Sequence, residues 1–220
     1  MKKIFLYGLM LCTAALGLAS CSDDDQLTDT RVTHFATLEL QGDEQVVLNV
    51  GDTFTEPGYV ATEGDEDITA KVVVSGNVNT SKAGFYNLVY SVANKDNFAV
   101  QSVRTIMVKD PNNLASAYFA STSRYEGAPI TITDNGDGTY EIDDVMGGYY
   151  FYYYYPGYEP TYDFHLEATV KLNDDNTLTQ VGAGSWYFSS LPTIASGSYD
   201  PATGVVQWTT SNGLAVTLTK

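Results

Sequence analysis

The sequence predicts an all-β chain that folds as two successive β domains. Short apolar runs alternate with polar residues at a period of two, which is typical of strands with one buried face. Turn residues such as Gly, Asn and Asp recur between these runs, at intervals of roughly 8–12 residues. No stretch of helical length has a period of 3.6 residues. Short strands at regular spacing favour a β-sandwich or a small barrel.

Residues 1–20 are predicted to be a signal peptide. Two lysines precede an uncharged apolar run over 4–18, which is too short for a spanning helix and typical of a secretory signal. The motif Leu18-Ala19-Ser20-Cys21 then resembles a bacterial lipobox. The resemblance implies cleavage before Cys21 and acylation of its thiol with fatty acyl chains such as palmitate, which anchor a protein in a membrane. An ordinary secretory signal with a cysteine there by chance is the alternative.

Residues 21–37 are predicted to form a lipidated tether. The cluster Ser22-Asp23-Asp24-Asp25 resembles the surface-export signal of Bacteroidota lipoproteins. The resemblance implies an outer-membrane lipoprotein displayed on the cell surface, and a periplasm-facing outer-membrane lipoprotein is the alternative. As a flexible coil the tether would reach roughly 20–25 Å, which keeps the first domain close to the membrane.

The composition excludes several classes of partner and site. The net charge is −16, and removal of Lys2 and Lys3 with the signal leaves 9 basic against 27 acidic groups, or −18. Such a surface repels phosphate backbones, so nucleic acid is not an expected partner. Cys12 leaves with the signal and Cys21 takes lipid. The remaining chain therefore has no disulfide, no cysteine metal site and no cysteine nucleophile.

Residues 38–110 are predicted to form the first β domain. Strands are expected at Gln45–Val50, Lys71–Ser75, Phe85–Val92 and Val103–Val108. Alternate residues of the third strand share one face, namely Tyr86, Leu88, Tyr90 and Val92.

This domain resembles the bacterial surface immunoglobulin-like domains. The matching residues are, in order, Gly51-Asp52, Phe54, Glu56-Pro57-Gly58-Tyr59, Asp67-Ile68-Thr69, Val74, Gly76, Val78-Asn79-Thr80, Ala83-Gly84-Phe85-Tyr86, Leu88, Tyr90 and Asn94 to Asn97. The family pattern usually ends with an aspartate before the last hairpin turn, where this chain has Asn94-Lys95-Asp96-Asn97. The resemblance implies an immunoglobulin-like β-sandwich that acts as a spacer, with direct ligand binding as the alternative. Tyr86 lies where a tyrosine corner would tie a loop to the sheet.

Residues 111–220 are predicted to form an antiparallel meander of eight or nine strands. It would close as a small barrel or as a two-sheet sandwich. Hairpin turns are expected at Asn135–Gly138, Asn173–Asn176, Asp200–Gly204 and Asn212-Gly213. One strand is expected over Phe164–Leu172, where apolar and polar residues alternate.

The second domain holds 13 of the 17 tyrosines, and a run over 149–158 is the densest part. As a strand, the run would place Tyr150, Tyr152 and Tyr154 on one face, and Tyr149, Phe151, Tyr153 and Tyr155 on the other. Exposed rings would stack on sugars, whereas burial of both faces would make the run part of the core. The candidate ligand-binding residues are Tyr149, Tyr152, Tyr153, Tyr155, Tyr158 and Trp186. Trp208 lies between apolar strand residues and is expected in the core.

The second domain also resembles the carboxy-terminal domain of a poorly characterised group of Bacteroidota lipoproteins. The matching residues are Ile132 to Tyr140, Met146-Gly147-Gly148-Tyr149-Tyr150, Gly197 to Gly204, and Val216 to Lys220. The resemblance implies an immunoglobulin-like domain joined to this domain, in proteins suspected of binding glycans.

The sequence offers no diagnostic metal, cofactor or catalytic site. Glu63, Asp65 and Asp67 alternate in one loop, and Asp134, Asp137 and Glu141 surround one turn. The first set has no closing bidentate carboxylate downstream, so a solvated loop is the better interpretation, and a glycine-bearing hairpin turn explains the second set. The chain has only two histidines, His34 and His165, and no elbow-type serine. The chain is therefore not expected to be an enzyme.

Two functions fit these observations. In the first, a surface lipoprotein captures a polysaccharide or oligosaccharide through its tyrosine-rich domain. In the second, it is a structural or docking subunit whose aromatic surface meets another outer-membrane protein.

Overall fold

The computed structural model describes residues 32–158 and 161–220. The predicted signal, Cys21 and most of the predicted tether lie outside these ranges. Regular structure in the described residues is almost all strand, which confirms the all-β prediction. None of the helices in this part of the chain is long and apolar enough to cross a membrane.

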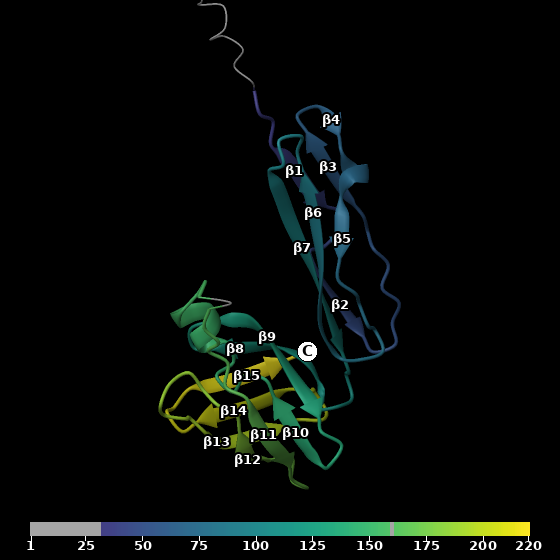
Figure 1. Cartoon of the computed structure of the whole chain (residues 1–220). Helices are drawn as coiled ribbons and strands as arrows, with labels where there is room; N and C mark the ends of the chain where they lie inside the picture. The colour runs from purple at the N-terminus through teal and green to yellow at the C-terminus, as the bar shows by residue number, and fades with distance from the viewer. Residues whose placement is uncertain (1–31, 159–160) are drawn as a thin grey trace, which may run out of the picture. The chain divides into compact units, whose positions relative to one another are not determined.

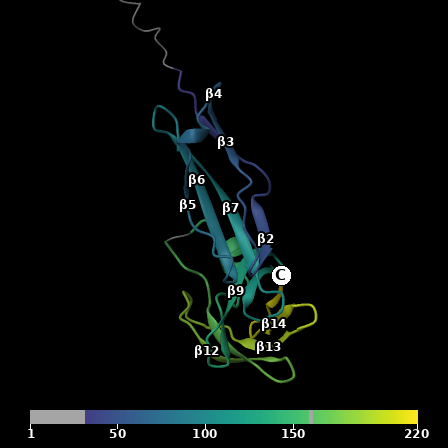
Figure 2. The same cartoon turned by 90° about the vertical axis from the view of Figure 1, so that its right-hand side faces the viewer.

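The first domain is an immunoglobulin-like sandwich of two sheets (Figure 1). One sheet has the order β1 (Ala36–Leu40), β3 (Tyr59–Glu63) and β4 (Glu66–Asp67). The other has the order β2 (Gln45–Asn49), β7 (Ala99–Lys109), β6 (Gly84–Ala93) and β5 (Val73–Ser75), and the short 3-10 helix η2 (Thr69–Lys71) precedes β5. The pairing of β2 with β7 is parallel and the other pairs are antiparallel. Figure 2 shows the long β6 and β7 beside β5 and β2.

The predicted alternation of β6 is confirmed by burial. Leu88, Tyr90 and Val92 are buried, and Tyr86 packs partly buried against the same core. The Tyr86 hydroxyl donates to the Lys82 carbonyl at 2.8 Å, which confirms the expected tie between this ring and a loop. Burial raises the pKa of Tyr86 above its ordinary value.

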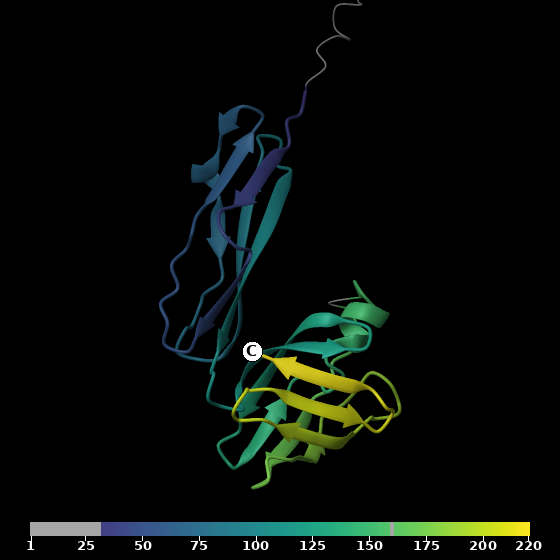
Figure 3. The same ribbon diagram turned by 180° about the vertical axis from the view of Figure 1, so that it is seen from behind.

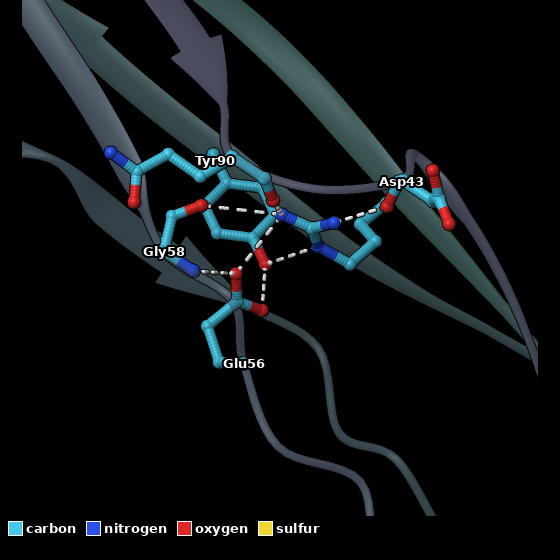
Figure 4. Close-up of polar contacts among 6 residues, drawn as sticks. Asp43, Glu56, Gly58 and Tyr90 are labelled. Carbon is cyan, nitrogen blue, oxygen red and sulfur yellow. Dashed lines mark hydrogen bonds and ion pairs between the residues drawn. The ribbon is translucent and has the colours of Figure 1, made fainter.

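A fully buried arginine joins both sheets of this sandwich (Figure 4). Arg104 on β7 forms an ion pair with Glu56 at 3.1 Å and donates to the Tyr90 hydroxyl at 3.4 Å. Tyr90 in turn donates to Glu56. The remaining guanidinium hydrogens go to the carbonyls of Gln41, at 2.8 Å, Gly58, at 3.2 Å, and Asp43. The segment that leaves β1 and the segment that enters β3 therefore converge on one side chain.

The second domain is an eight-stranded antiparallel sheet that closes almost into a barrel. Its strands are β8 (Ser116–Thr122), β9 (Glu126–Asp134), β10 (Thr139–Ile142), β11 (Ala168–Leu172), β12 (Leu178–Ala183), β13 (Ile194–Tyr199), β14 (Val206–Thr210) and β15 (Ala215–Thr219). The spatial order is β12-β11-β10-β9-β8-β15-β14-β13. Figure 3 shows the yellow C-terminal strands running side by side. The predicted meander and its hairpin turns are confirmed. Because its eight strands form one sheet that nearly closes on itself, the domain is a barrel and not a two-sheet sandwich.

The two edge strands meet without a regular ladder. Thr177 and Ser198 form an isolated bridge, and the Tyr199 N–H donates to the Asn176 carbonyl at 2.9 Å. Farther along, the Ile194 N–H donates to the side-chain oxygen of Gln180 at 2.7 Å. Trp208 is 3% exposed inside the barrel, as expected.

Two expected strands are wrong in the second domain. The tyrosine run forms a π-helical turn, η3 (Tyr149–Tyr154), instead of a strand. The strand expected from Phe164 begins only at Ala168, although Phe164 and Leu166 are buried and His165 and Glu167 are less so. In both cases the residues belong to one long connection between β10 and β11, and its described residues belong to no strand.

Substitution of Arg104 by Ala is expected to lower the stability of the first domain by about 3–5 kcal/mol. The change leaves Glu56 and three backbone carbonyls without the buried guanidinium, and removing one partner is the costly way to break such a pair. Urea unfolding followed by circular dichroism measures the loss. Both tryptophans lie in the second domain, so the tryptophan fluorescence transition is the internal control. An unchanged dichroism midpoint would contradict the prediction.

Candidate functional site

The connection between β10 and β11, residues 143–167, is called the aromatic loop here. The two ends of this loop, called its neck here, meet at the buried carboxylate of Asp144. One carboxylate oxygen accepts from the N–H groups of Met146, at 2.9 Å, and Leu166, at 3.2 Å, and the other accepts from Gly148 at 2.8 Å. Burial raises the pKa of Asp144, and the three N–H donors oppose that shift. A single side chain thus fixes both ends of the loop.

The loop turns sharply after its neck because two glycines take positive φ. Gly147 has φ 57° and Gly148 has φ 74°. A Cβ on Gly148 would lie 2.3 Å from the Cβ of Ala128, and one on Gly147 would lie 2.6 Å from a methyl group of Val216. Both the backbone conformation and the close packing against the barrel strands therefore require glycine.

The helix η3 follows directly from this turn. The Tyr152 N–H donates to the Gly148 carbonyl at 2.8 Å, and the Tyr155 N–H reaches back five residues to the Tyr150 carbonyl at 2.9 Å. Such π-helical turns occur mostly as single turns and frequently at functional sites. Here the turn spreads successive rings around an axis instead of alternating them between two faces.

Two indole groups hold the aromatic loop to the barrel. Trp208, from β14, donates to the Val145 carbonyl at 2.8 Å. Trp186, from the connection between β12 and β13, donates to the Phe164 carbonyl at 3.1 Å. The loop is therefore attached at both ends by donors from other parts of the barrel.

The rings of the two connections form one continuous cluster. Tyr155 stacks on Phe164 with centroids 4.7 Å apart, and Trp186 contacts Tyr150 at 5.3 Å and Phe188 at 4.9 Å. An inner layer is buried or partly buried. Its members are Tyr149, Tyr150, Phe151, Tyr152, Tyr155, Phe164, Trp186 and Phe188.

An outer layer of tyrosines lies exposed on this support and is called the aromatic surface here. Its rings are between 40% and 55% exposed. They are Tyr153, Tyr154, Tyr158, Tyr162 and Tyr187. Tyr162 contacts Tyr158 at 6.1 Å and Tyr187 at 5.4 Å, so rings from both connections adjoin.

The structure separates the predicted site residues into these two layers. Tyr153 and Tyr158 belong to the aromatic surface, whereas Tyr149, Tyr152, Tyr155 and Trp186 lie in the supporting layer. Tyr154, Tyr162 and Tyr187 were missed as candidates. In a strand Tyr154 would lie on the face opposite Tyr153, whereas the helical turn exposes both rings.

A depression of about 230 Å³ adjoins the cluster. It lies between η3 and the turns that follow β8 and β14. Its lining includes Arg124, Tyr149, Tyr150 and Asn212, with Met146 and Leu214 among its apolar residues. Burial, followed by the neighbouring tyrosines, raises the pKa of Tyr150.

Asp143, Asp163 and His165 also lie near the ends of the loop, and each contacts neighbouring groups of the protein. Burial raises the pKa of Asp143 to about 7, although the Thr131 N–H donates to it at 2.9 Å. His165 stacks on Phe151 at 4.3 Å, and its Nδ1 lies 2.7 Å from the Asp163 carboxylate. The His165 N–H lowers the pKa of Asp163. Within residues 32–158 and 161–220, no group of three or more His, Cys, Asp or Glu side chains could hold a metal ion.

Comparison with protein families gives two matches. The bacterial surface protein immunoglobulin-like domain matches residues 38–108. A second family, described as a C-terminal domain, matches residues 75–220. Nothing among the curated proteins matches the chain.

Solved structures include a relative of similar length. The crystal structure of the lipoprotein BT2262 from Bacteroides thetaiotaomicron is 33% identical, covers 84% of this chain and 98% of its own, and has a TM-score of 0.60. A Clostridium perfringens ZmpB structure with the module CBM51-2 and GlcNAc is 18% identical over 79% of this chain and 29% of its own, with a TM-score of 0.29. At that TM-score the second likeness carries no argument about this chain.

Substitution of Asp144 by Ala is expected to destabilise the second domain by about 3 kcal/mol or more. Three N–H groups at the neck lose their acceptor, and each buried unsatisfied group costs about 1–3 kcal/mol. Urea unfolding followed by tryptophan fluorescence measures the change. Asp174→Ala, at an exposed turn residue, is the matched control. Equal midpoints for both variants would refute the role of Asp144.

Substitution of Asp143 by Asn is expected to stabilise the protein above pH 7 and to have little effect near pH 4. The folded pKa of about 7 exceeds the ordinary value of 3.8, so the folded state binds the proton more tightly. The stabilisation that the protonated Asp143 contributes to the wild type is then fully present below pH 3.8 and is lost as the pH rises to about 7. At about 1.4 kcal/mol per pKa unit, the difference reaches a few kcal/mol.

Thermal unfolding of the wild type and the Asp143→Asn variant at several pH values tests this. Asp163→Asn should act in the opposite direction, because the pKa of Asp163 is lowered and its contribution is lost on acidification. A constant stability difference between pH 4 and 8 would be incompatible with the raised pKa of Asp143.

Proposed function

The chain belongs to the family of Bacteroidota surface lipoproteins that join a bacterial surface immunoglobulin-like domain to this C-terminal β domain, and from this premise we propose that it binds carbohydrate. In this proposal the protein is anchored in the outer membrane through Cys21 and faces outward. The immunoglobulin-like domain acts as a spacer, and the barrel domain binds a polysaccharide or oligosaccharide through the aromatic surface.

The observation that carries the proposal is the exposure of five tyrosine rings on a braced support. Exposed rings of this number on adjoining segments are unusual for an acidic surface, because large apolar side chains outside the core lose the benefit of burial. Ring faces stack on the apolar faces of sugars, and tyrosine hydroxyls can bond to sugar oxygens. The inner layer and the Asp144 neck hold these rings in place, so little conformational entropy is lost on binding.

The predicted candidates in the supporting layer have a different part in this proposal. Tyr149, Tyr152, Tyr155 and Trp186 position the exposed rings, and Tyr149 also lines the depression. Tyr153 and Tyr158, together with Tyr154, Tyr162 and Tyr187, would contact the sugar directly.

Substitution of Tyr153 and Tyr154 by Ala together is expected to weaken glycan binding roughly thirty-fold. Each lost stacking contact is worth about 1 kcal/mol, and about 1.4 kcal/mol corresponds to tenfold in affinity. Residues 22–220, which hold every strand from β1 to β15, are titrated with a panel of neutral and acidic polysaccharides by affinity electrophoresis and calorimetry.

The matched control is Phe98→Ala, an exposed aromatic residue of the immunoglobulin-like domain, which should leave binding unchanged. Both variants should retain the wild-type melting temperature, since the substituted rings are exposed. If no polysaccharide binds, or if the double variant binds as well as the wild type, the proposal fails. Capture of an outer-membrane protein that depends on Tyr153 and Tyr154 would then favour the docking alternative.

A further inference from the structure

We propose that the depression beside the aromatic surface binds the anionic group of an acidic sugar, with Arg124 as the charged partner. The anionic group is a carboxylate, as in a uronic acid, or a sulfate ester, since both present oxygens to a guanidinium in the same way. This inference rests on the proposed carbohydrate binding and specifies the class of sugar.

The depression has the size of a subsite and not of a complete ligand site. Its volume of about 230 Å³ lies below the range of about 300–1,000 Å³ that is usual for ligand pockets. It is continuous with the aromatic cluster through Tyr149 and Tyr150, which line it on one side. A sugar stacked on the adjoining rings could therefore place one substituent in the depression.

Arg124 and Asn212 offer hydrogen-bond donors to the depression. Within the described residues, no carboxylate forms an ion pair with Arg124. The side-chain oxygen of Asn212 accepts from the Thr210 hydroxyl, which leaves its amide nitrogen with no acceptor in the described part of the chain. Donors without acceptors match a ligand that supplies oxygens, and charge-assisted bonds of this kind are about twice as strong as neutral ones.

Both turns that carry these donors are fixed by threonines. At the turn after β8, Thr122 Oγ1 accepts from the N–H groups of Arg124, at 3.3 Å, and Tyr125, at 3.1 Å. At the turn after β14, Thr210 Oγ1 accepts from the Leu214 N–H at 3.0 Å. Tyr125 also stacks on Tyr152 of η3, with centroids 5.4 Å apart and planes 15° from parallel. The backbone around the depression is thus held in place before any ligand arrives.

The second domain has few positively charged side chains, and one of them, Arg124, lines the depression. Residues 111–220 contain three basic side chains, Arg124, Lys171 and Lys220. Lys220 donates to the carbonyls of Asp110 and Asn113, and Lys171 lies in β11 opposite Thr139. Because the whole chain carries a net charge of −16, an anionic sugar is repelled elsewhere and is attracted at Arg124.

The test compares charged and uncharged forms of one polysaccharide. Residues 22–220 are titrated with polygalacturonate and with its methyl ester, and in a second arm with dextran sulfate and dextran, all at 0.15 M salt, which is about the physiological ionic strength. In at least one arm the wild type should bind the charged form roughly tenfold more tightly, as expected for a hydrogen-bonded charge. The arm that shows the preference distinguishes carboxylate from sulfate.

Arg124→Gln should abolish this preference by weakening binding of the charged form roughly tenfold. Lys171→Gln, which removes one exposed positive charge from the same domain, should retain the preference. If the wild type binds neutral and charged forms equally, or if Arg124→Gln keeps the preference, the inference is overturned while the proposed carbohydrate binding stands. If the Tyr153 and Tyr154 rings matter for no sugar at all, carbohydrate binding fails and the inference fails with it.

Discussion

The carboxylate of Asp144 is the constraint on which the aromatic end of the second domain depends. The described residues of the aromatic loop belong to no strand, so a regular ladder does not satisfy their backbone groups. Asp144 supplies acceptors for three N–H groups drawn from both ends of the loop. Without this neck, fewer contacts would offset the conformational entropy that a connection of such length loses when it is held in one conformation. The rings that the loop carries would then have no fixed arrangement.

The barrel geometry explains why two distant parts of the sequence share one aromatic cluster. In an antiparallel meander, the connections after β8, β10, β12 and β14 all emerge at the same end. Near that end the edge strands β12 and β13 separate, and each pairing beside them contains a register shift. The side chain of Gln180 replaces a missing backbone acceptor for Ile194. The register shifts blunt the two unpaired sheet edges, and the connection that carries Trp186 and Tyr187 joins β12 to β13 at this end.

Period-two alternation and turn residues were sufficient to predict most of the fold. Both signals arise where a strand pairs with neighbouring strands and buries one of its faces. They predicted the inward face of β6, the position of Trp208 and the meander. They could not predict η3, because aromatic residues favour strands only where a sheet offers a partner. The turn at Gly147 and Gly148 and the acceptor at Asp144 impose a helical path instead. The exposure of Tyr154 depended on that path. Tyr162, Tyr187 and Arg124 lie in loops and turns, where no periodic pattern reports which side chains are exposed.

The layered arrangement of rings links stability to recognition. With no disulfide expected in the mature chain, the loops at this end are held by ring packing and by indole N–H bonds, so the inner rings serve as core. The outer rings add little to stability because they remain exposed. Substitutions in the outer layer can therefore change affinity without cost to folding, whereas substitutions at Tyr150 or Trp186 would alter both. In this arrangement the choice of sugar can vary among relatives through the outer rings and Arg124 while the support stays the same.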